Sequence, residues 1–133
     1  MASTRKIVFA PDGVPPLPVF SQGVITGDLL YASGCIGCDN DLKLVSSDIK
    51  EQTIRALENI HKVIRAAGSS LDHLVKVNVF IVDLPGNFAP MNEAYTKFFE
   101  GIQVPARTCV GVVALPLSAL VEFECVAEVV APK

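Results

Sequence analysis

The segment Asp48–Gly68, DIKEQTIRALENIHKVIRAAG, decides the fold expected for this chain of 133 residues. Its apolar side chains recur with the 3.6-residue period of a helix, and charged residues fill the remaining surface. The apolar stripe consists of Ile49, Thr53, Ala56, Leu57, Ile60, Val63, Ile64 and Ala67. Asp48 and Glu51 have the spacing of a capping box, and Gly68 supplies a left-handed stop. The segment therefore predicts one long amphipathic helix.

Strand-like segments flank this helix on both sides. The upstream strands are expected at Arg5–Ala10, Gly23–Thr26 and Leu29–Ser33, and the downstream strand at Leu74–Val82. Gly27 and Asp28 form a two-residue turn, so the second and third strands make a tight hairpin. Four prolines in residues 11–18 exclude both helix and central strand, so this stretch is a loop. Leu74–Val82 is apolar on one whole face, which indicates a central strand.

The C-terminal half contains one more helix and two more strands. The helix is expected at Phe88–Glu100, with Asn87 as its cap and Gly101 as its stop, and the strands at Arg107–Ala114 and Leu120–Val130. Only five residues separate the two strands, which predicts a second hairpin. The complete order predicts an α+β fold, a single mixed sheet with two helices packed on one face, in one domain covering residues 1–133.

The amino-acid composition and the net charge limit the classes of function that we expect for this chain. Half of the residues are hydrophobic and only 19% are charged, so we expect some apolar surface to meet another subunit. The formal net charge of −3 lacks the basic excess of a nucleic-acid binder and disfavours a membrane-surface role. No apolar run is long enough to cross a bilayer, and the N-terminus has no signal-peptide core. We therefore expect a soluble cytoplasmic protein.

The cysteines are expected to be reduced thiols. Cys35 and Cys38 have the spacing of a metal or redox pair, but turn-forming residues follow them, and Cys109 and Cys125 do not form a second such pair. We therefore expect neither a metal site nor a disulfide framework.

Three glutamates share one face of the last expected strand. Alternation along Leu120–Val130 places Glu122, Glu124 and Glu128 opposite a row of apolar residues, and Arg107 opens the preceding strand. These residues fit two interpretations, a solvated outer face with an ordinary surface arginine, or a site that uses the charges chemically. Glu124 would raise the pKa of Glu122 whereas Arg107 would lower it, so its direction stays open.

Eight short motifs, in this order and spacing, make the chain resemble the reactive intermediate deaminase (RidA) family, also called the L-PSP endoribonuclease or perchloric-acid-soluble protein family. They are Phe20-Ser21-Gln22-Gly23, Ser33-Gly34, Gln52 with Ala56-Leu57-Glu58-Asn59-Ile60, Ala67-Gly68-Ser69-Ser70-Leu71, Asn92-Glu93-Ala94-Tyr95, Phe98-Phe99, Pro105-Ala106-Arg107, and Leu115-Pro116 with Val121-Glu122-Phe123-Glu124. The resemblance covers nearly the whole sequence. It implies a chorismate-mutase-like subunit that assembles as a homotrimer with three clefts between subunits.

The resemblance also implies a reaction and a set of site residues. Arg107 would bind the substrate carboxylate and Glu122 would position or activate water, while backbone groups around Cys109 hold the substrate. Ser33 and Asn92 stand at positions of further polar site residues, and Phe20 stands where the family often has tyrosine. The implied reaction is hydrolysis of 2-imino acids, such as 2-iminobutanoate and 2-iminopropanoate, to 2-oxo acids and ammonia, without a cofactor. These imines arise from enamines released by pyridoxal-dependent dehydratases.

The residue types suit this chemistry. A guanidinium offers a carboxylate two parallel donors, and a nearby carboxylate can orient water and carry a proton to the leaving ammonia. Two other functions are considered, a non-enzymatic small-carboxylate binder or chaperone-like trimer, and a ribonuclease or translation inhibitor. Simple anion binding needs only the arginine, and the acidic net charge counts against RNA binding. Phe20 and Cys35 depart from the usual family residues, which leaves the substrate range open.

Overall fold

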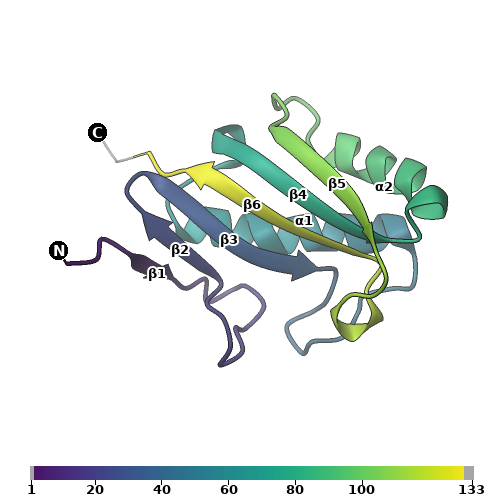
Figure 1. Cartoon of the computed structure of the whole chain (residues 1–133), viewed down its shortest axis with the longest axis horizontal. Helices are drawn as coiled ribbons and strands as arrows, with labels where there is room; N and C mark the ends of the chain where they lie inside the picture. The colour runs from purple at the N-terminus through teal and green to yellow at the C-terminus, as the bar shows by residue number, and fades with distance from the viewer. Residues whose placement is uncertain (1, 131–133) are drawn as a thin grey trace.

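The computed structural model describes residues 2–130, which form one mixed sheet with two α-helices (Figure 1). The elements are β1 (Lys6–Val8), β2 (Gly23–Thr26), β3 (Leu29–Ile36), α1 (Ile49–Ala66), β4 (Leu74–Val82), α2 (Leu84–Phe98), β5 (Ala106–Val112) and β6 (Val121–Glu128), with short 3₁₀ turns at Leu71–His73 and Pro116–Ser118. The strand order across the six-stranded sheet is β1-β2-β3-β6-β4-β5.

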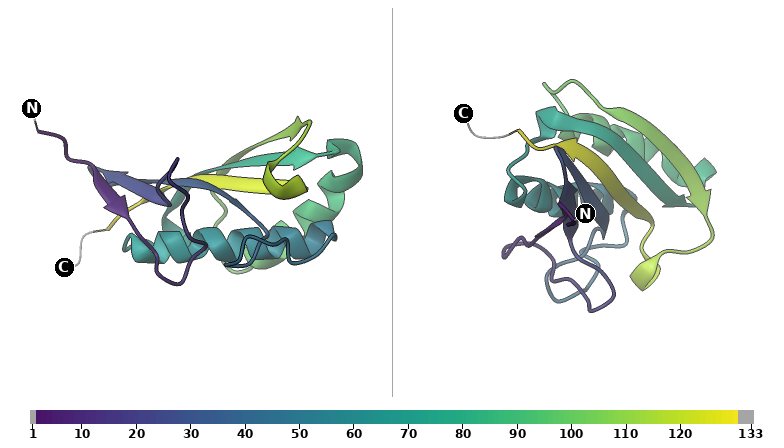
Figure 2. Two further views of the ribbon diagram at one scale, coloured as in Figure 1. Left: turned by 90° about the horizontal axis from the view of Figure 1, so that it is seen from below. Right: turned by 60° about the vertical axis from the view of Figure 1, so that its left-hand side comes forward.

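Both helices lie on the same face of the sheet. Seen from below the view of Figure 1, α1 and α2 run side by side beneath the strands (Figure 2). α1 packs against β3 and β6, whereas α2 packs against β4 and β5. The expected α+β fold, a mixed sheet with two helices on one face, is therefore confirmed. No helix in the described part of the chain is long and apolar enough to cross a membrane.

Helix α1 forms as its sequence predicts. The Asp48 carboxylate accepts a hydrogen bond from the Glu51 backbone N–H at 3.0 Å, and Gly68 follows the helix with a φ of +81°. Every residue of the expected apolar stripe is buried, and the same face also buries two amides, Gln52 and Asn59. Asn59 Nδ2 donates to the carbonyls of Ile36 and Cys38 at 3.0 and 2.9 Å. α1 therefore fixes the chain where it leaves β3.

The start of the second helix was predicted too late. α2 begins at Leu84 with Asp83 as its N-cap, whereas the sequence pattern predicted Asn87 as the cap. Proline is tolerated in the first turn of a helix, where its missing N–H needs no intrahelical partner, so Pro85 does not delay the helix. Asn87 instead lies in the first turn, and its Nδ2 donates to the Val82 carbonyl at 2.7 Å.

The second expected hairpin is wrong. β5 pairs in parallel with β4, and β6 pairs antiparallel with both β3 and β4, so β4 lies between β5 and β6. Helix α2 carries the chain back along the sheet, which makes β4, α2 and β5 a parallel crossover unit. The segment between β5 and β6 then passes the end of β4, with Leu117 and Ser118 at φ values of +57° and +60°.

The alternation predicted for the last strand is present in β6. Val121, Phe123, Cys125 and Ala127 are buried against the helices, and Glu122, Glu124 and Val126 point to the opposite face. That outer face has no helix over it and carries several apolar side chains, among them Tyr31 and Val110, which are 49% and 42% exposed. A single chain therefore leaves uncovered one sheet face that carries both apolar and charged side chains.

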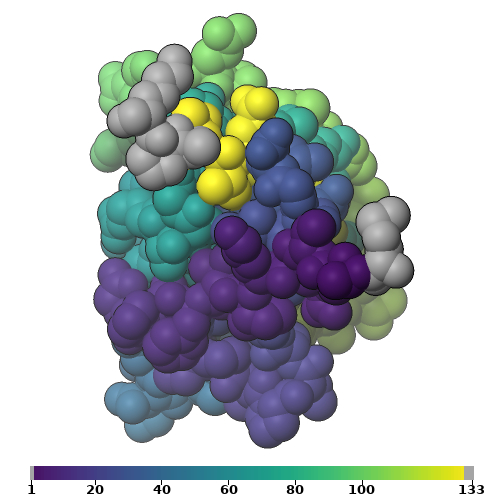
Figure 3. Space-filling view, turned by 90° about the vertical axis from the view of Figure 1, so that its left-hand side faces the viewer, coloured from purple at the N-terminus to yellow at the C-terminus, as the bar shows by residue number. Residues whose placement is uncertain are grey.

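β1 and the C-terminal end of β6 lie at the same end of the molecule. The space-filling view of this end shows the N-terminal segment in purple and the end of β6 in yellow (Figure 3). The Val129 N–H donates to the Asp28 carbonyl at 2.8 Å, which ties the residues after β6 to the β2–β3 turn.

Replacing the α1 cap tests the energetic role of this helix. We expect Asp48→Ala to lower the free energy of unfolding by about 1 kcal/mol, because the Glu51 N–H loses its side-chain acceptor. Urea unfolding at a fixed protein concentration measures the change. Asp41→Ala is the matched control, since the hydrogen bond at Asp41 is made by its backbone N–H. Equal stability of Asp48→Ala and the wild type would contradict the prediction.

Candidate functional site

The Glu122 carboxylate lies on the outer face of the sheet. In the ladder Glu122 stands opposite Ile36 of β3 and Phe80 of β4. The register of β3 shifts between Ala32 and Cys35, and this irregularity brings the backbone of Gly34 beneath the carboxylate. A Cβ atom at Gly34 would lie 2.7 Å from the Glu122 carboxyl carbon. Because Gly34 has no side chain, the Glu122 carboxyl group can lie directly against the backbone of β3.

The surroundings of Glu122 favour its neutral form. Burial raises the pKa of the Glu122 carboxyl, and the neighbouring Glu124 carboxylate raises it further. Glu124 is held in place by Asn78, whose Nδ2 donates to Glu124 Oε1 at 3.1 Å. A carboxyl with a raised pKa exchanges protons closer to neutral pH than an exposed one, which suits a group that both accepts and returns a proton.

Arg107 lies on the helix side of the sheet. Its ladder partner, Val77, is buried under the helices, and the Arg107 guanidinium carbon lies 4.9 Å from the ring centroid of Tyr95 in α2. The Phe88 ring is 5.9 Å away, and Arg107 Nη1 lies 4.0 Å from Met91 Sδ. Neither of the two ion pairs found among residues 2–130 involves Arg107. Aromatic faces thus hold the guanidinium without neutralising its charge.

These contacts of Arg107 were not predicted from the sequence. The aromatic face of the second helix was expected to lie in the core, which is correct for Tyr95, but this ring also contacts the guanidinium. A signal was present, because Phe88, Met91 and Tyr95 are spaced three and four residues apart and so line one helical face.

The two charged residues expected to act together lie on opposite faces of the sheet. Glu122 points away from the helices, and Arg107 contacts α2. Within one chain the structure therefore does not bring the Arg107 guanidinium and the Glu122 carboxylate together.

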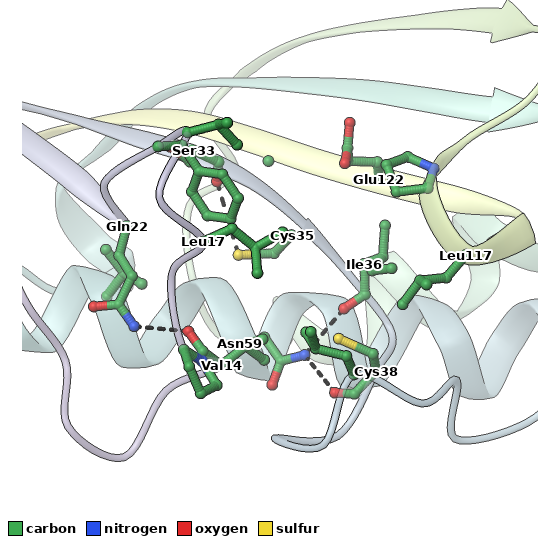
Figure 4. Close-up of a pocket in the computed structure, with 17 residues that line it drawn as sticks. Val14, Leu17, Gln22, Ser33, Cys35, Ile36, Cys38, Asn59, Leu117 and Glu122 are labelled. Atoms are coloured by element: carbon green, nitrogen blue, oxygen red, sulfur yellow. Dashed lines mark hydrogen bonds between the residues drawn. The ribbon is translucent and has the colours of Figure 1, made fainter.

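The other expected site residues divide between these two places. Phe20 and Ser33 line a cavity of about 390 Å³ together with Glu122 (Figure 4). Cys109 is two residues from Arg107 in β5, its thiol packs against the core, and burial raises the pKa of that thiol. β5 is an edge strand of the described sheet, so its backbone groups are paired on one side only. Asn92 joins neither group and lines a separate shallow groove on α2 with Thr96 and Val104.

The cysteine and acidic side chains of the described residues form no cluster that could bind a metal ion. All four cysteines are free thiols. Among residues 2–130, no three side chains of His, Cys, Asp or Glu gather closely enough to hold a metal ion. The charged groups among the expected site residues are the Arg107 guanidinium and the Glu122 carboxyl group.

The chain is similar to known proteins in both sequence and structure over most of its length. A family model described as Endoribonuclease L-PSP matches residues 12–129. RutC family protein UK114 of Drosophila melanogaster is 40% identical over 124 residues, which cover 92% of this chain and 88% of that protein. Reactive Intermediate Deaminase A, chloroplastic, of Arabidopsis thaliana is 34% identical over 128 residues, 95% of this chain and 67% of that protein. The crystal structure of E. coli TdcF with bound serine is 33% identical, with a TM-score of 0.87 over 92% of this chain and 98% of that one.

Removing the neighbouring charge tests the electrostatics of Glu122. We expect Glu124→Gln to lower the pKa of the Glu122 carboxyl, because a like charge then no longer opposes its ionisation. The pKa stays above that of an exposed carboxyl, since burial is the larger cause. A ¹³C NMR titration of labelled glutamate carboxyls measures both values. Glu128→Gln, an exposed glutamate farther along the same face, should leave the pKa unchanged. A Glu122 pKa that does not respond to Glu124→Gln would show that the two carboxyls are not coupled.

Proposed function

Because this chain belongs to the RidA family, the family described as Endoribonuclease L-PSP, we propose that it is a deaminase that hydrolyses reactive 2-imino acids. Its substrates would include 2-iminobutanoate and 2-iminopropanoate, and its products the 2-oxo acids and ammonia. The observation that carries the proposal is the pair of complementary half-sites: a guanidinium that has no acidic partner among residues 2–130, and a half-buried carboxyl group beside a cavity.

The proposed site is shared by two subunits of a homotrimer. Arg107 and Glu122 lie on opposite faces of one sheet, so both reach one substrate only if each comes from a different chain. The exposed apolar side chains on the outer face, among them Tyr31 and Val110, support such an assembly, because a partner would shield them from water. In a closed ring of three subunits, the β5 edge of one chain meets the Glu122 face of the next, and this contact repeats three times.

In the proposed reaction Arg107 holds the substrate carboxylate through two parallel hydrogen bonds. Glu122 takes a proton from water as the water oxygen bonds to C2 of the imine, and the C=N double bond becomes a single bond. The carboxyl group returns this proton to the nitrogen, which becomes an amino group. It then takes the proton of the C2 hydroxyl and passes it to the nitrogen as the C–N bond breaks, so ammonia leaves while the C2 carbonyl forms. Water supplies the carbonyl oxygen and the protons balance, so no cofactor takes part.

The remaining expected residues have supporting roles in this proposal. Backbone groups of the β5 edge at Cys109 bind the substrate, while Ser33 and Phe20 lie beside Glu122. Ser33 Oγ already donates to the Ser21 carbonyl at 2.6 Å, so it orders the wall and keeps an acceptor for the substrate. Asn92 lies on α2 away from both groups, and its part in the site stays a prediction.

Relatives support a small carboxylate ligand for this site. E. coli TdcF is described with bound serine, which carries the same α-carboxylate as a 2-imino acid. The net charge of −3 disfavours a nucleic-acid substrate, although the family description includes the word endoribonuclease. A cytoplasmic location stays a prediction, because relatives include proteins named as mitochondrial and chloroplastic.

Two substitutions separate substrate binding from chemistry. We expect Glu122→Gln to lower kcat by at least about 100-fold while the affinity for 2-oxobutanoate changes little, because glutamine keeps the shape but cannot accept the proton. Arg107→Ala should abolish 2-oxobutanoate binding, because the carboxylate loses its paired donors. A threonine dehydratase assay that follows imine decay, together with calorimetric titration of 2-oxobutanoate, measures both.

The controls for these variants are Glu128→Gln and Arg65→Ala, which remove the same groups from exposed positions. Imine hydrolysis by Glu122→Gln at the wild-type rate would contradict a catalytic role for the carboxyl group. Normal binding of 2-oxobutanoate to Arg107→Ala would contradict the role of Arg107 as the carboxylate anchor. A wild type that hydrolyses no imine would support the alternative hypothesis of a non-enzymatic binder.

Mixed trimers test whether the site is shared. Refolding equal amounts of Arg107→Ala and Glu122→Gln chains together should restore about one quarter of the wild-type sites, because each site then draws each residue from a random chain. Each variant refolded alone should stay inactive. Mixed trimers without activity would mean that both residues act within one chain.

A further inference from the structure

The cavity beside Glu122 continues around the edge of the sheet toward α1. β2 pairs with β3 only as far as Ala32, so the last residues of β3 leave one edge without a strand partner in the described sheet. Figure 4 shows Glu122 on the sheet at one side of this space and Asn59 of α1 at the other. The proline-rich loop and the 3₁₀ turn Pro116–Ser118 complete the walls.

The walls of the cavity are apolar. The lining side chains include Val14, Leu17, Phe20, Ile36, Leu42 and Leu117. Burial raises the pKa of the Cys35 thiol to about 12, so this lining side chain is uncharged at neutral pH. Apart from the Glu122 carboxyl group, the cavity therefore offers no charge to a ligand.

Hydrogen bonds fix these walls in position. Gln22 Oε1 accepts from the Ala10 N–H at 2.6 Å, and its Nε2 donates to the Val14 carbonyl at 2.8 Å, which holds the proline-rich loop. On the other side, Asn59 Nδ2 binds two carbonyls of the chain after β3. The cavity is therefore formed before any ligand enters, which lowers the entropic cost of binding.

Asn59 closes the cavity on the side of α1. The residue is 1% exposed, and its amide group anchors the chain after β3, so it offers a ligand no accessible polar atom. It stands at the side of the cavity opposite Glu122, so the cavity extends well beyond the carboxyl group.

The size of the cavity exceeds what the smallest substrates need. A volume of about 390 Å³ falls in the range of pockets that hold complete small molecules, whereas the side chain of 2-iminopropanoate is one methyl group. Resting on the proposed deaminase function, we propose that this cavity is a subsite for the substrate side chain and selects 2-imino acids with large apolar side chains, branched aliphatic or aromatic.

Rates with different imines test this selectivity. Imines of leucine, phenylalanine and alanine are generated in place by an L-amino-acid oxidase, and semicarbazide traps the imine that remains. The wild type should hydrolyse the leucine and phenylalanine imines with a kcat/KM at least about tenfold above that for the alanine imine, because each added buried methylene favours the larger substrate. Equal values for the three imines would overturn the proposal.

A variant that fills the cavity tests its location. Val14→Phe adds volume at the wall and should remove the preference, lowering kcat/KM at least about tenfold for the leucine and phenylalanine imines and less than about twofold for the alanine imine. Val45→Phe makes the same change at a half-exposed valine outside the cavity and should keep the preference. If Val14→Phe lowers kcat/KM equally for all three imines, the substrate side chain does not bind in this cavity.

Binding of non-reactive 2-oxo acids distinguishes a failure of this inference from a failure of the proposed function. The wild type should bind 4-methyl-2-oxopentanoate at least about tenfold more tightly than pyruvate, and Val14→Phe should remove the difference. If this difference holds but no imine is hydrolysed, the deaminase proposal is wrong and the subsite stands. If imines are hydrolysed but the two 2-oxo acids bind equally, the subsite is wrong and the deaminase proposal stands.

Discussion

β6 lies between two strands, and its side chains alternate between the two faces of the sheet. This alternation is the constraint on which the rest of the structure depends. β6 is paired on both sides, with β3 and β4, and every second side chain from Val121 to Ala127 is buried under the helices. A shift of register by one residue would move Phe123 to the outer face and Glu122 into the core. Burial of the apolar row therefore fixes the direction of the Glu122 carboxyl group without any specific contact to it.

The same sheet keeps the two opposite charges apart within one chain. If the Arg107 guanidinium and the Glu122 carboxylate met in one subunit, they would form an ion pair that competes with a substrate carboxylate and lowers the pKa of Glu122. Instead, aromatic rings of α2 hold the guanidinium, and burial raises the pKa of the carboxyl group. Within one chain neither group is paired with the other. In the proposed trimer they face each other across a subunit interface, where the substrate carboxylate takes the two donors of Arg107.

Local patterns predicted the elements of this fold better than they predicted its connections. The period of Asp48–Gly68 and the alternation of β6 depend on neighbouring residues, and both were predicted correctly. The β5–β6 hairpin was wrong because the partner of a strand is chosen by distant packing, here by the crossover through α2. The cavity could not be predicted for the same reason, since Val14, Asn59 and Leu117 are far apart in the sequence.

The irregularity in β3 connects the carboxyl group to the cavity. A regular strand would continue its pairing with β2 beyond Ala32 and would place a side chain beneath Glu122. The pairing ends because β2 begins only at Gly23, opposite Ala32, and the register shift against β6 together with Gly34 leaves room for the carboxyl group against the backbone. The Glu122 carboxyl group and the apolar cavity thus come together at one local distortion, so under the proposed function a change in β3 would affect the chemistry and the substrate range at once.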